Sequence, residues 1–115
     1  MLRLILIILA ISGSALAYAD GPTSEAQIKP AKRIVALAPH IVESLFEIGA
    51  GERIVATVDY ADHPTQALDI PRVGGYYGIQ IEKILALNPD LILVWQNGNK
   101  AEDIAQLEKL GLPLA

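Results

Sequence analysis

The sequence of 115 residues contains no cysteine. This absence excludes disulfide bonds, thiolate metal sites and a lipid anchor attached through a cysteine. Basic residues are also scarce, because nine Lys and Arg stand against 13 Asp and Glu, which gives a formal net charge of −4. No cluster of basic residues is available to neutralise a phosphate backbone, so nucleic acid is not expected as a partner.

Long hydrophobic runs are missing apart from one short stretch at the N terminus. Residues 1–3 carry one positive charge, the apolar stretch 4–17 follows, and small residues then fit a cleavage site after Ala17 or Ala19. The stretch is shorter than the roughly 20 apolar residues of a membrane-spanning helix. It therefore predicts a secretory signal peptide at residues 1–19. Its removal takes away Arg3 and changes the net charge from −4 to −5. Export without disulfides indicates the periplasm.

The remaining chain divides into two parts by composition. Residues 20–31 are rich in Gly, Pro, Ser and Thr and predict a flexible lead-in. Residues 32–115 carry the regular hydrophobic patterns and are long enough to bury a small core. A strand pattern begins at the last residues, 111–115, so we expect this lobe to be an incomplete N-terminal portion of a longer protein.

Strand and helix patterns alternate along residues 32–115. Strands are expected at 33–37, 53–58 and 90–94, and helices at 39–48, 80–87 and 100–110. The unbroken apolar run 91–94 is typical of a strand buried on both faces of a parallel sheet. This alternation predicts an α/β fold with a parallel sheet.

Smaller features complete the expected fold. Pro39 suits the first position of a helix, and Glu43 is expected in its first turn. The expected inner faces of two helices are Ile41, Leu45 and Ile48, and Ile104, Leu107 and Leu110. Residues 74–78 predict a glycine-rich loop.

Aromatic residues are few, and their positions are informative. Beyond the signal peptide, four of the five fall in loops expected at the carboxyl ends of strands: Tyr60, Tyr76, Tyr77 and Trp95. Pro39 follows the first strand at the same edge. Ligands of open parallel sheets bind at this edge, and aromatic rings suit a large, flat, partly polar molecule. Trp95 taken alone favours a cap on the core, whereas the clustering of the aromatic residues at this edge favours a binding surface.

Catalytic and metal-binding patterns are lacking. Ser44 falls inside a helix, and Gly74-Gly75 lacks the spacing of a phosphate-binding loop. His40 and His63 are too few for a zinc site and are expected in solvated loops, while Asp62 and Asp69 suit turns. We therefore expect no enzymatic activity, cofactor or metal.

Several segments together resemble a known family. The runs 33–39, 73–75, 81–87 and 89–92, followed by Gln106-Leu107 and Leu110-Gly111, resemble the periplasmic binding proteins that deliver cobalamin, haem and iron-siderophores to ABC importers. The resemblance extends over essentially all of residues 32–115. It implies the N-terminal lobe of a protein with two α/β lobes joined by a long helix, with the ligand held between the lobes.

Two segments resemble the cobalamin-binding members of this family. They are residues 60–67, which read Tyr-Ala-Asp-His-Pro-Thr-Gln-Ala, and residues 94–99, where tryptophan precedes a glycine-asparagine loop. The resemblance implies a corrin site lined on this lobe by Pro39, Tyr60, Tyr76 and Trp95. At position 76 those members carry tryptophan, so Tyr76 departs from their pattern.

The resemblance also implies partners. Glu82 matches an acidic residue that binds arginines on the permease in the inner membrane, and the protein is expected to be a monomer. Cobalamin would then be a transported ligand rather than a cofactor. Two alternatives stay open: a haem or siderophore binder, in which Tyr60, Tyr76 or Tyr77 reaches iron, and an α/β enzyme whose catalytic residues lie outside this chain.

Overall fold

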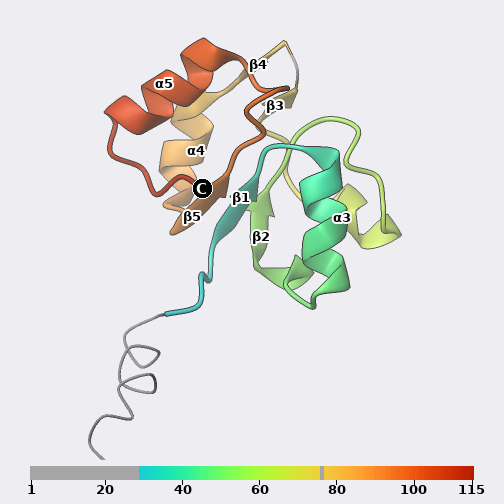
Figure 1. Cartoon of the computed structure of the whole chain (residues 1–115). Helices are drawn as coiled ribbons and strands as arrows, with labels where there is room; N and C mark the ends of the chain where they lie inside the picture. Colours follow the sequence, from blue (N-terminus) through green and yellow to red (C-terminus); the bar gives the residue numbers. More distant parts are fainter. Residues whose placement is uncertain (1–28, 76) are drawn as a thin grey trace, which may run out of the picture. The chain divides into compact units, whose positions relative to one another are not determined.

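The computed structural model describes residues 29–75 and 77–115 (Figure 1). The expected signal peptide, residues 20–28 of the lead-in, and Tyr76 lie outside the described residues. Residues 31–115 form one compact unit. No helix in the described part of the chain has the length and apolar character needed to cross a membrane.

A small parallel sheet forms the centre of the unit. Strands β1 (Ile34–Ala36), β2 (Ile54–Ala56) and β5 (Leu91–Leu93) lie in the order β2-β1-β5, and both pairings are parallel. Leu114 continues the sheet beside β5 through a parallel bridge to Ile92. The predicted parallel α/β fold is confirmed, with each of these three strands shorter than its predicted range.

Three α-helices and two short 3-10 helices surround the sheet. The α-helices are α3 (Pro39–Glu47), α4 (Ile81–Leu87) and α5 (Ala101–Lys109), and the 3-10 helices are η1 (Gly51–Arg53) and η2 (Thr65–Asp69). Pro39 stands at the start of α3, as its fixed φ angle favours. Asn88 follows the last residue of α4 and adopts the left-handed conformation, which asparagine tolerates better than most residues. Pro89 comes next and disfavours continuation of the helix.

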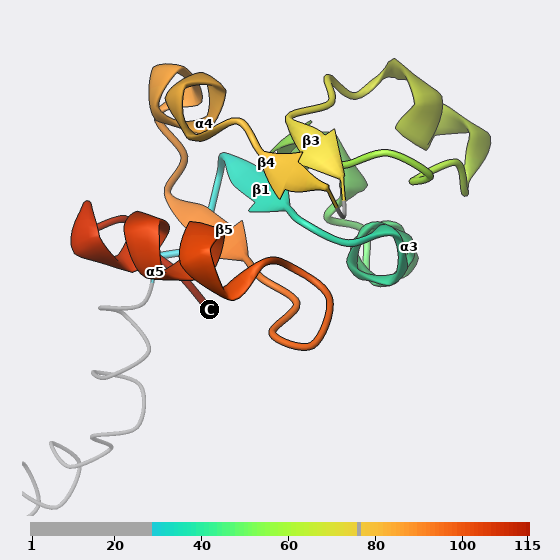
Figure 2. The ribbon, with the colours of Figure 1, turned by 90° about the horizontal axis from the view of Figure 1, so that it is seen from above.

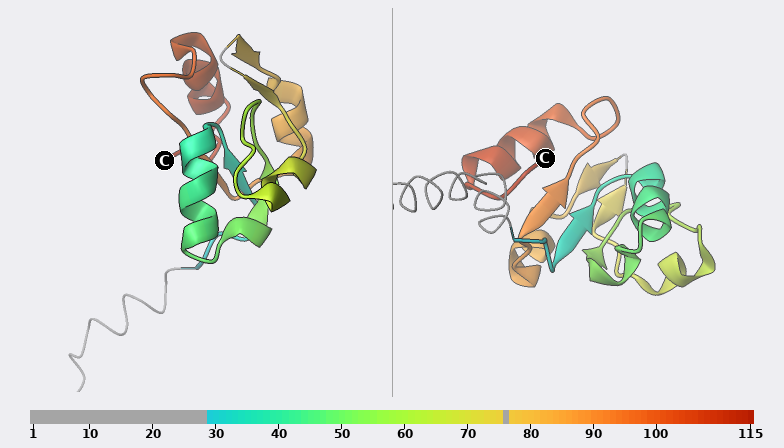
Figure 3. Two further views of the ribbon diagram at one scale, coloured as in Figure 1. Left: turned by 90° about the vertical axis from the view of Figure 1, so that its right-hand side faces the viewer. Right: turned by 60° about the horizontal axis from the view of Figure 1, so that its bottom comes forward.

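Two apolar clusters fill the two faces of the sheet. Ile34 and Ala36 of β1 pack with Val42 and Leu45 of α3. Val35 of β1 and Leu37, which directly follows β1, instead pack in a cluster that includes Ile84 of α4, Ile92 of β5 and Leu107 of α5. Helices α3 and α4 accordingly lie on opposite sides of the sheet (Figure 2; Figure 3, left). The period of two along β1 explains why one strand serves both clusters.

Some sequence expectations about burial are wrong. Ile48 is 77% exposed and Leu110 is also exposed, because α3 and α5 end one residue before them. In β5 only Ile92 is buried, while Leu91 and Leu93 are half-buried. Glu43 is exposed and lies beyond the first turn of α3, since that helix already begins at Pro39.

The expected glycine-rich loop is instead a short hairpin. Strands β3 (Gly74–Gly75) and β4 (Gly78–Ile79) pair antiparallel. Gly74 has a φ of +144°, and a Cβ there would meet the carbonyl oxygen of Gly78. The close approach of two backbones therefore requires glycine. The amide of Asp59 donates to the carbonyl of Gly74 at 2.8 Å, which ties the hairpin to the segment after β2.

Asp90 holds the start of β1 beside β5. Its carboxylate accepts hydrogen bonds from the backbone amides of Lys32 at 2.8 Å and Arg33 at 2.8 Å. These two bonds hold the pKa of Asp90 below its ordinary value, because they favour the charged form. A carboxylate with a lowered folded-state pKa stabilises the fold above its unfolded pKa, and the stabilisation is lost as pH falls through the folded pKa.

We expect Asp90→Asn to be less stable than the unsubstituted chain at neutral pH, with the difference shrinking as pH falls below about 4. The asparagine keeps an acceptor oxygen but loses the charge that strengthens both bonds. Urea unfolding at several pH values measures this difference. Asp69→Asn, which removes an exposed carboxylate that makes no hydrogen bond with the described residues, is the control. A stability difference independent of pH would contradict this account.

Candidate functional site

A small pocket lies at the carboxyl ends of the strands. It has a volume of about 150 Å³. Its lining comes from the segments that follow the three strands and from the hairpin: Leu37, Pro39, Val58, Asp59, Tyr60, Gly75, Trp95, Gly98 and Asn99. The structure thus brings together three of the four expected ligand-binding residues, Pro39, Tyr60 and Trp95. The fourth, Tyr76, lies outside the described residues.

Trp95 stands at the rim of this pocket. It is 42% exposed, so the indole is neither fully in the core nor free in solvent. The ring of His40 meets it edge to face, with centroids 5.1 Å apart and planes at 82°. A Cβ at Gly98 would collide with the indole, so glycine at this position allows the ring to lie against the backbone. Trp95 is therefore positioned by its own loop.

Asn99 fixes that loop to the sheet. Its Oδ1 accepts a hydrogen bond from the backbone amide of Trp95 at 2.6 Å, and its Nδ2 donates to the carbonyl of Leu37 at 2.8 Å. The backbone amide of Asn99 also donates to the carbonyl of Trp95 at 2.8 Å. One side chain thereby joins the ends of β1 and β5.

Tyr60 is the second aromatic residue that lines the pocket. It is 73% exposed and has a φ of 69°, a conformation unusual for a residue other than glycine. Arg72 holds the chain just after it, because its Nη2 donates to the carbonyl of Ala61 at 3.0 Å and lies 3.6 Å from the carboxylate of Asp62. Asp62, expected to serve a turn, also takes part in an ion pair.

Tyr77 and Asp59 interact with each other at this edge of the sheet. The Asp59 carboxylate raises the pKa of Tyr77, mainly through its charge and also by accepting a hydrogen bond. The phenol is thereby held in its neutral form. Sequence reasoning missed Asp59 as a site residue, although its place directly after a predicted strand and before Tyr60 was a usable signal.

The remaining candidates lie in other places. Glu82 is exposed in the first turn of α4, beside a separate hollow of about 490 Å³ lined by Gln80, Ile81, Glu82, Lys83 and Gln106.

The histidines and Ser44 form no catalytic or metal-binding group in the described residues. His40, expected in a loop, lies in α3, and His63 is exposed in a loop before Pro64. Ser44 donates to the carbonyl of His40 within α3. The described residues include no group of three or more His, Cys, Asp or Glu side chains able to hold a metal.

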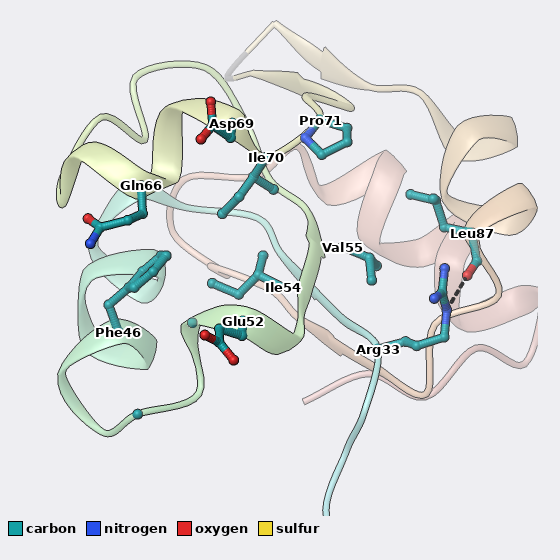
Figure 4. Close-up of a pocket in the computed structure, with 12 residues that line it drawn as sticks. Arg33, Phe46, Glu52, Ile54, Val55, Gln66, Asp69, Ile70, Pro71 and Leu87 are labelled. Atoms are coloured by element: carbon teal, nitrogen blue, oxygen red, sulfur yellow. Dashed lines mark hydrogen bonds between the residues drawn. The ribbon is translucent and has the colours of Figure 1, made fainter.

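A larger hollow of about 780 Å³ lies at the amino ends of the strands (Figure 4). Phe46, Ile54 and Ile70 line one part of it, and Arg33 lies at another (Figure 4). The Nε of Arg33 donates to the carbonyl of Leu87 at 2.8 Å, so this cation is already used to close the end of α4. Phe46 is the one aromatic lining residue, whereas the smaller pocket has two, Tyr60 and Trp95. The aromatic side chains therefore favour the carboxyl edge.

Comparison with protein families shows the family to which the chain belongs. A family model described as periplasmic binding protein matches residues 34–114. The chain belongs to this family. It is 44% identical to the vitamin B12-binding protein of Vibrio cholerae over 93 residues, which is 81% of this chain and 34% of that protein. The chain thus spans about a third of the length of the curated relatives that it matches.

Solved structures give the same result. The crystal structure of the periplasmic vitamin B12-binding protein BtuF of V. cholerae superposes with a TM-score of 0.73 at 45% identity, covering 75% of this chain and 34% of that one. The periplasmic haem-binding protein RhuT from Roseiflexus sp. RS-1, in its apo form, gives 0.68 at 33% identity, covering 75% and 33%. The predicted family and the predicted lobe are confirmed.

We expect Asn99→Ala to destabilise the lobe by about 1–3 kcal/mol, because the carbonyl of Leu37 and the amide of Trp95 both lose a partner. The indole should also become more mobile. Emission of Trp95, the one tryptophan of the chain, is expected to shift to longer wavelength and to be quenched more readily by acrylamide.

Asn97→Ala, in the same loop but with no hydrogen bond to the described residues through its side chain, is the matched control for Asn99→Ala. Equal emission spectra for both variants would show that Asn99 does not position the ring.

Proposed function

We propose that this chain is the N-terminal lobe of an exported solute-binding component of an ABC importer, and that its ligand is cobalamin. In this proposal Pro39, Tyr60, Tyr76 and Trp95 form one side of the ligand site. The observation that supports it most is the pocket that joins Tyr60, Pro39 and the pre-positioned Trp95 at the carboxyl edge of the sheet. An aromatic edge of this kind suits a broad macrocycle with a polar periphery.

The proposed role is binding rather than catalysis. The relatives are named as vitamin B12- or haem-binding proteins. A second lobe would supply the opposite side of the site, so we expect this lobe alone to bind weakly. The protein would act in the periplasm after removal of residues 1–19.

Haem is the second candidate, and the haem-binding relative at 33% identity favours it. Ligation of haem iron by tyrosine is strongest through the phenolate. Of the three tyrosines proposed above, Tyr77 is held neutral by Asp59, which raises its pKa. This opposes iron ligation by Tyr77 and leaves Tyr60 and Tyr76 as the tyrosines proposed for a haem ligand.

We expect cyanocobalamin to quench Trp95 fluorescence in the purified chain, since the corrin absorbs where indole emits. Tyr60→Ala should weaken the binding by about tenfold, because a large aromatic contact is lost. Leu68→Ala, an exposed apolar residue in η2, is the control. Saturable quenching by hemin with a Soret shift, together with no quenching by cyanocobalamin beyond the inner-filter effect, would exclude the cobalamin assignment.

We further propose that Glu82 contacts a basic residue of the inner-membrane permease. Its exposure in α4, outside the ligand pocket, supports a separate docking role. Glu82→Gln is expected to lower cobalamin uptake by cells that produce the protein, while quenching of Trp95 by cyanocobalamin stays unchanged. Glu43→Gln, an exposed glutamate on α3, is the control. Normal uptake with Glu82→Gln would refute the docking role.

A further inference from the structure

Asp59 is the one charged side chain among the residues that line the carboxyl-edge pocket. Asp59 is half-buried. It lies two residues beyond Thr57 in the segment that follows β2, next to Tyr60 in the chain. Its backbone is fixed by the hydrogen bond to the carbonyl of Gly74. A ligand in contact with Tyr60 and Trp95 would therefore lie close to Asp59, whose backbone is held by the hairpin.

The surroundings leave this carboxylate with its negative charge uncompensated. No cation of the described residues lies within 4 Å of it, and the one ion pair among them joins Arg72 to Asp62. Tyr77 donates a hydrogen bond to Asp59. Since a carboxylate has two oxygens and about four acceptor sites, most of its capacity to accept hydrogen bonds remains for a ligand.

Gly75 provides the space for this arrangement. A Cβ built on Gly75 would lie 2.9 Å from Oδ2 of Asp59 and 2.7 Å from the ring of Tyr77. The absence of a side chain at Gly75 lets both groups lie against the backbone of the hairpin, at the pocket wall. The Asp59 carboxylate and the Tyr77 ring thus both lie beside Gly75, and Gly75 is itself one of the residues that line the pocket.

The two candidate ligand classes differ in the groups at their edges. The corrin of cobalamin carries uncharged carboxamides, whose N–H groups donate hydrogen bonds, whereas haem carries propionate carboxylates, which only accept. A fixed carboxylate attracts the first and repels the second, and such repulsion is an effective source of specificity. We propose that Asp59 is a specificity-determining residue that accepts a hydrogen bond from a ligand carboxamide and excludes carboxylate-edged macrocycles. This inference rests on the proposed binding of cobalamin.

The test compares ligands that differ by a single group. Cyanocobalamin and its monocarboxylic acid derivatives, in which one carboxamide is replaced by a carboxylate, are titrated against the chain, with Trp95 quenching as the readout. We expect at least one acid to bind about tenfold more weakly than cyanocobalamin, the scale of one charge-assisted hydrogen bond. In Asp59→Asn, whose amide both accepts and donates, that ratio should fall to about one.

Two further variants keep the result interpretable. Asp69→Asn removes one negative charge from an exposed position in η2 and should retain the tenfold ratio. Asp59→Glu restores the carboxylate and should recover part of the ratio, which separates the effect of charge from a general loss of folding. Hemin, titrated in parallel, is expected to quench Asp59→Asn more strongly than the unsubstituted chain.

The possible outcomes separate the inference from the function on which it rests. If cyanocobalamin fails to quench the unsubstituted chain, the proposed function is wrong and the inference falls with it. If cyanocobalamin binds but none of the acids is disfavoured, or if Asp59→Asn keeps the same ratio, Asp59 does not select the ligand while the proposed function stands.

Discussion

The parallel, in-register pairing of β1 with β5 is the constraint on which the rest of this lobe depends. It sets Ile34, Val35 and Ala36 opposite Leu91, Ile92 and Leu93, and the amide of Leu37 continues it by donating to Leu93 at 3.0 Å. Because parallel strands end at the same edge, the chain after β1 and the chain after β5 emerge side by side. Asp90 secures this pairing at one end and Asn99 at the other.

The pocket is built largely from backbone held in place, and this suits a binding protein. The absence of a side chain at Gly98 lets the indole of Trp95 lie against the backbone, and the same absence at Gly75 makes room for Asp59 and Tyr77. Arg72 holds the turn after Tyr60 by a hydrogen bond. Side chains that are already fixed lose less conformational entropy when a ligand arrives, so more of the contact energy contributes to affinity. The lobe therefore offers a prepared half of a site rather than a surface that must rearrange.

Two carboxylates of this lobe, Asp59 and Glu82, lie in separate places and have different proposed roles. Asp59 lies in the ligand pocket, whereas Glu82 lies on α4 beside a different hollow. If both proposed roles hold, the separation allows the ligand to be selected and the permease to be contacted at the same time. It also means that substitution of either carboxylate leaves the other surface intact.

Much of the fold could be predicted from the sequence because its signals are local. Three short apolar runs, at residues 34–37, 54–56 and 91–94, predict the three parallel strands. Pro39 predicts the start of the helix that follows the first of them. The limits of burial could not be predicted, since Ile48 and Leu110 continue an apolar period past the points where α3 and α5 end. The hairpin at residues 74–79 was also missed, because its pairing depends on contact between two glycine backbones.

The candidate site divides in the same way. The sequence by itself determined that aromatic residues follow strands and therefore share one edge, which placed Pro39, Tyr60 and Trp95 together. Only the tertiary structure decided that Asn99 bridges two strand ends, that His40 meets Trp95, and that Asp59 lines the pocket with no cation of the described residues within 4 Å of its carboxylate. These relations join residues distant in the chain, and no local pattern encodes the direction in which a side chain points once the sheet has formed.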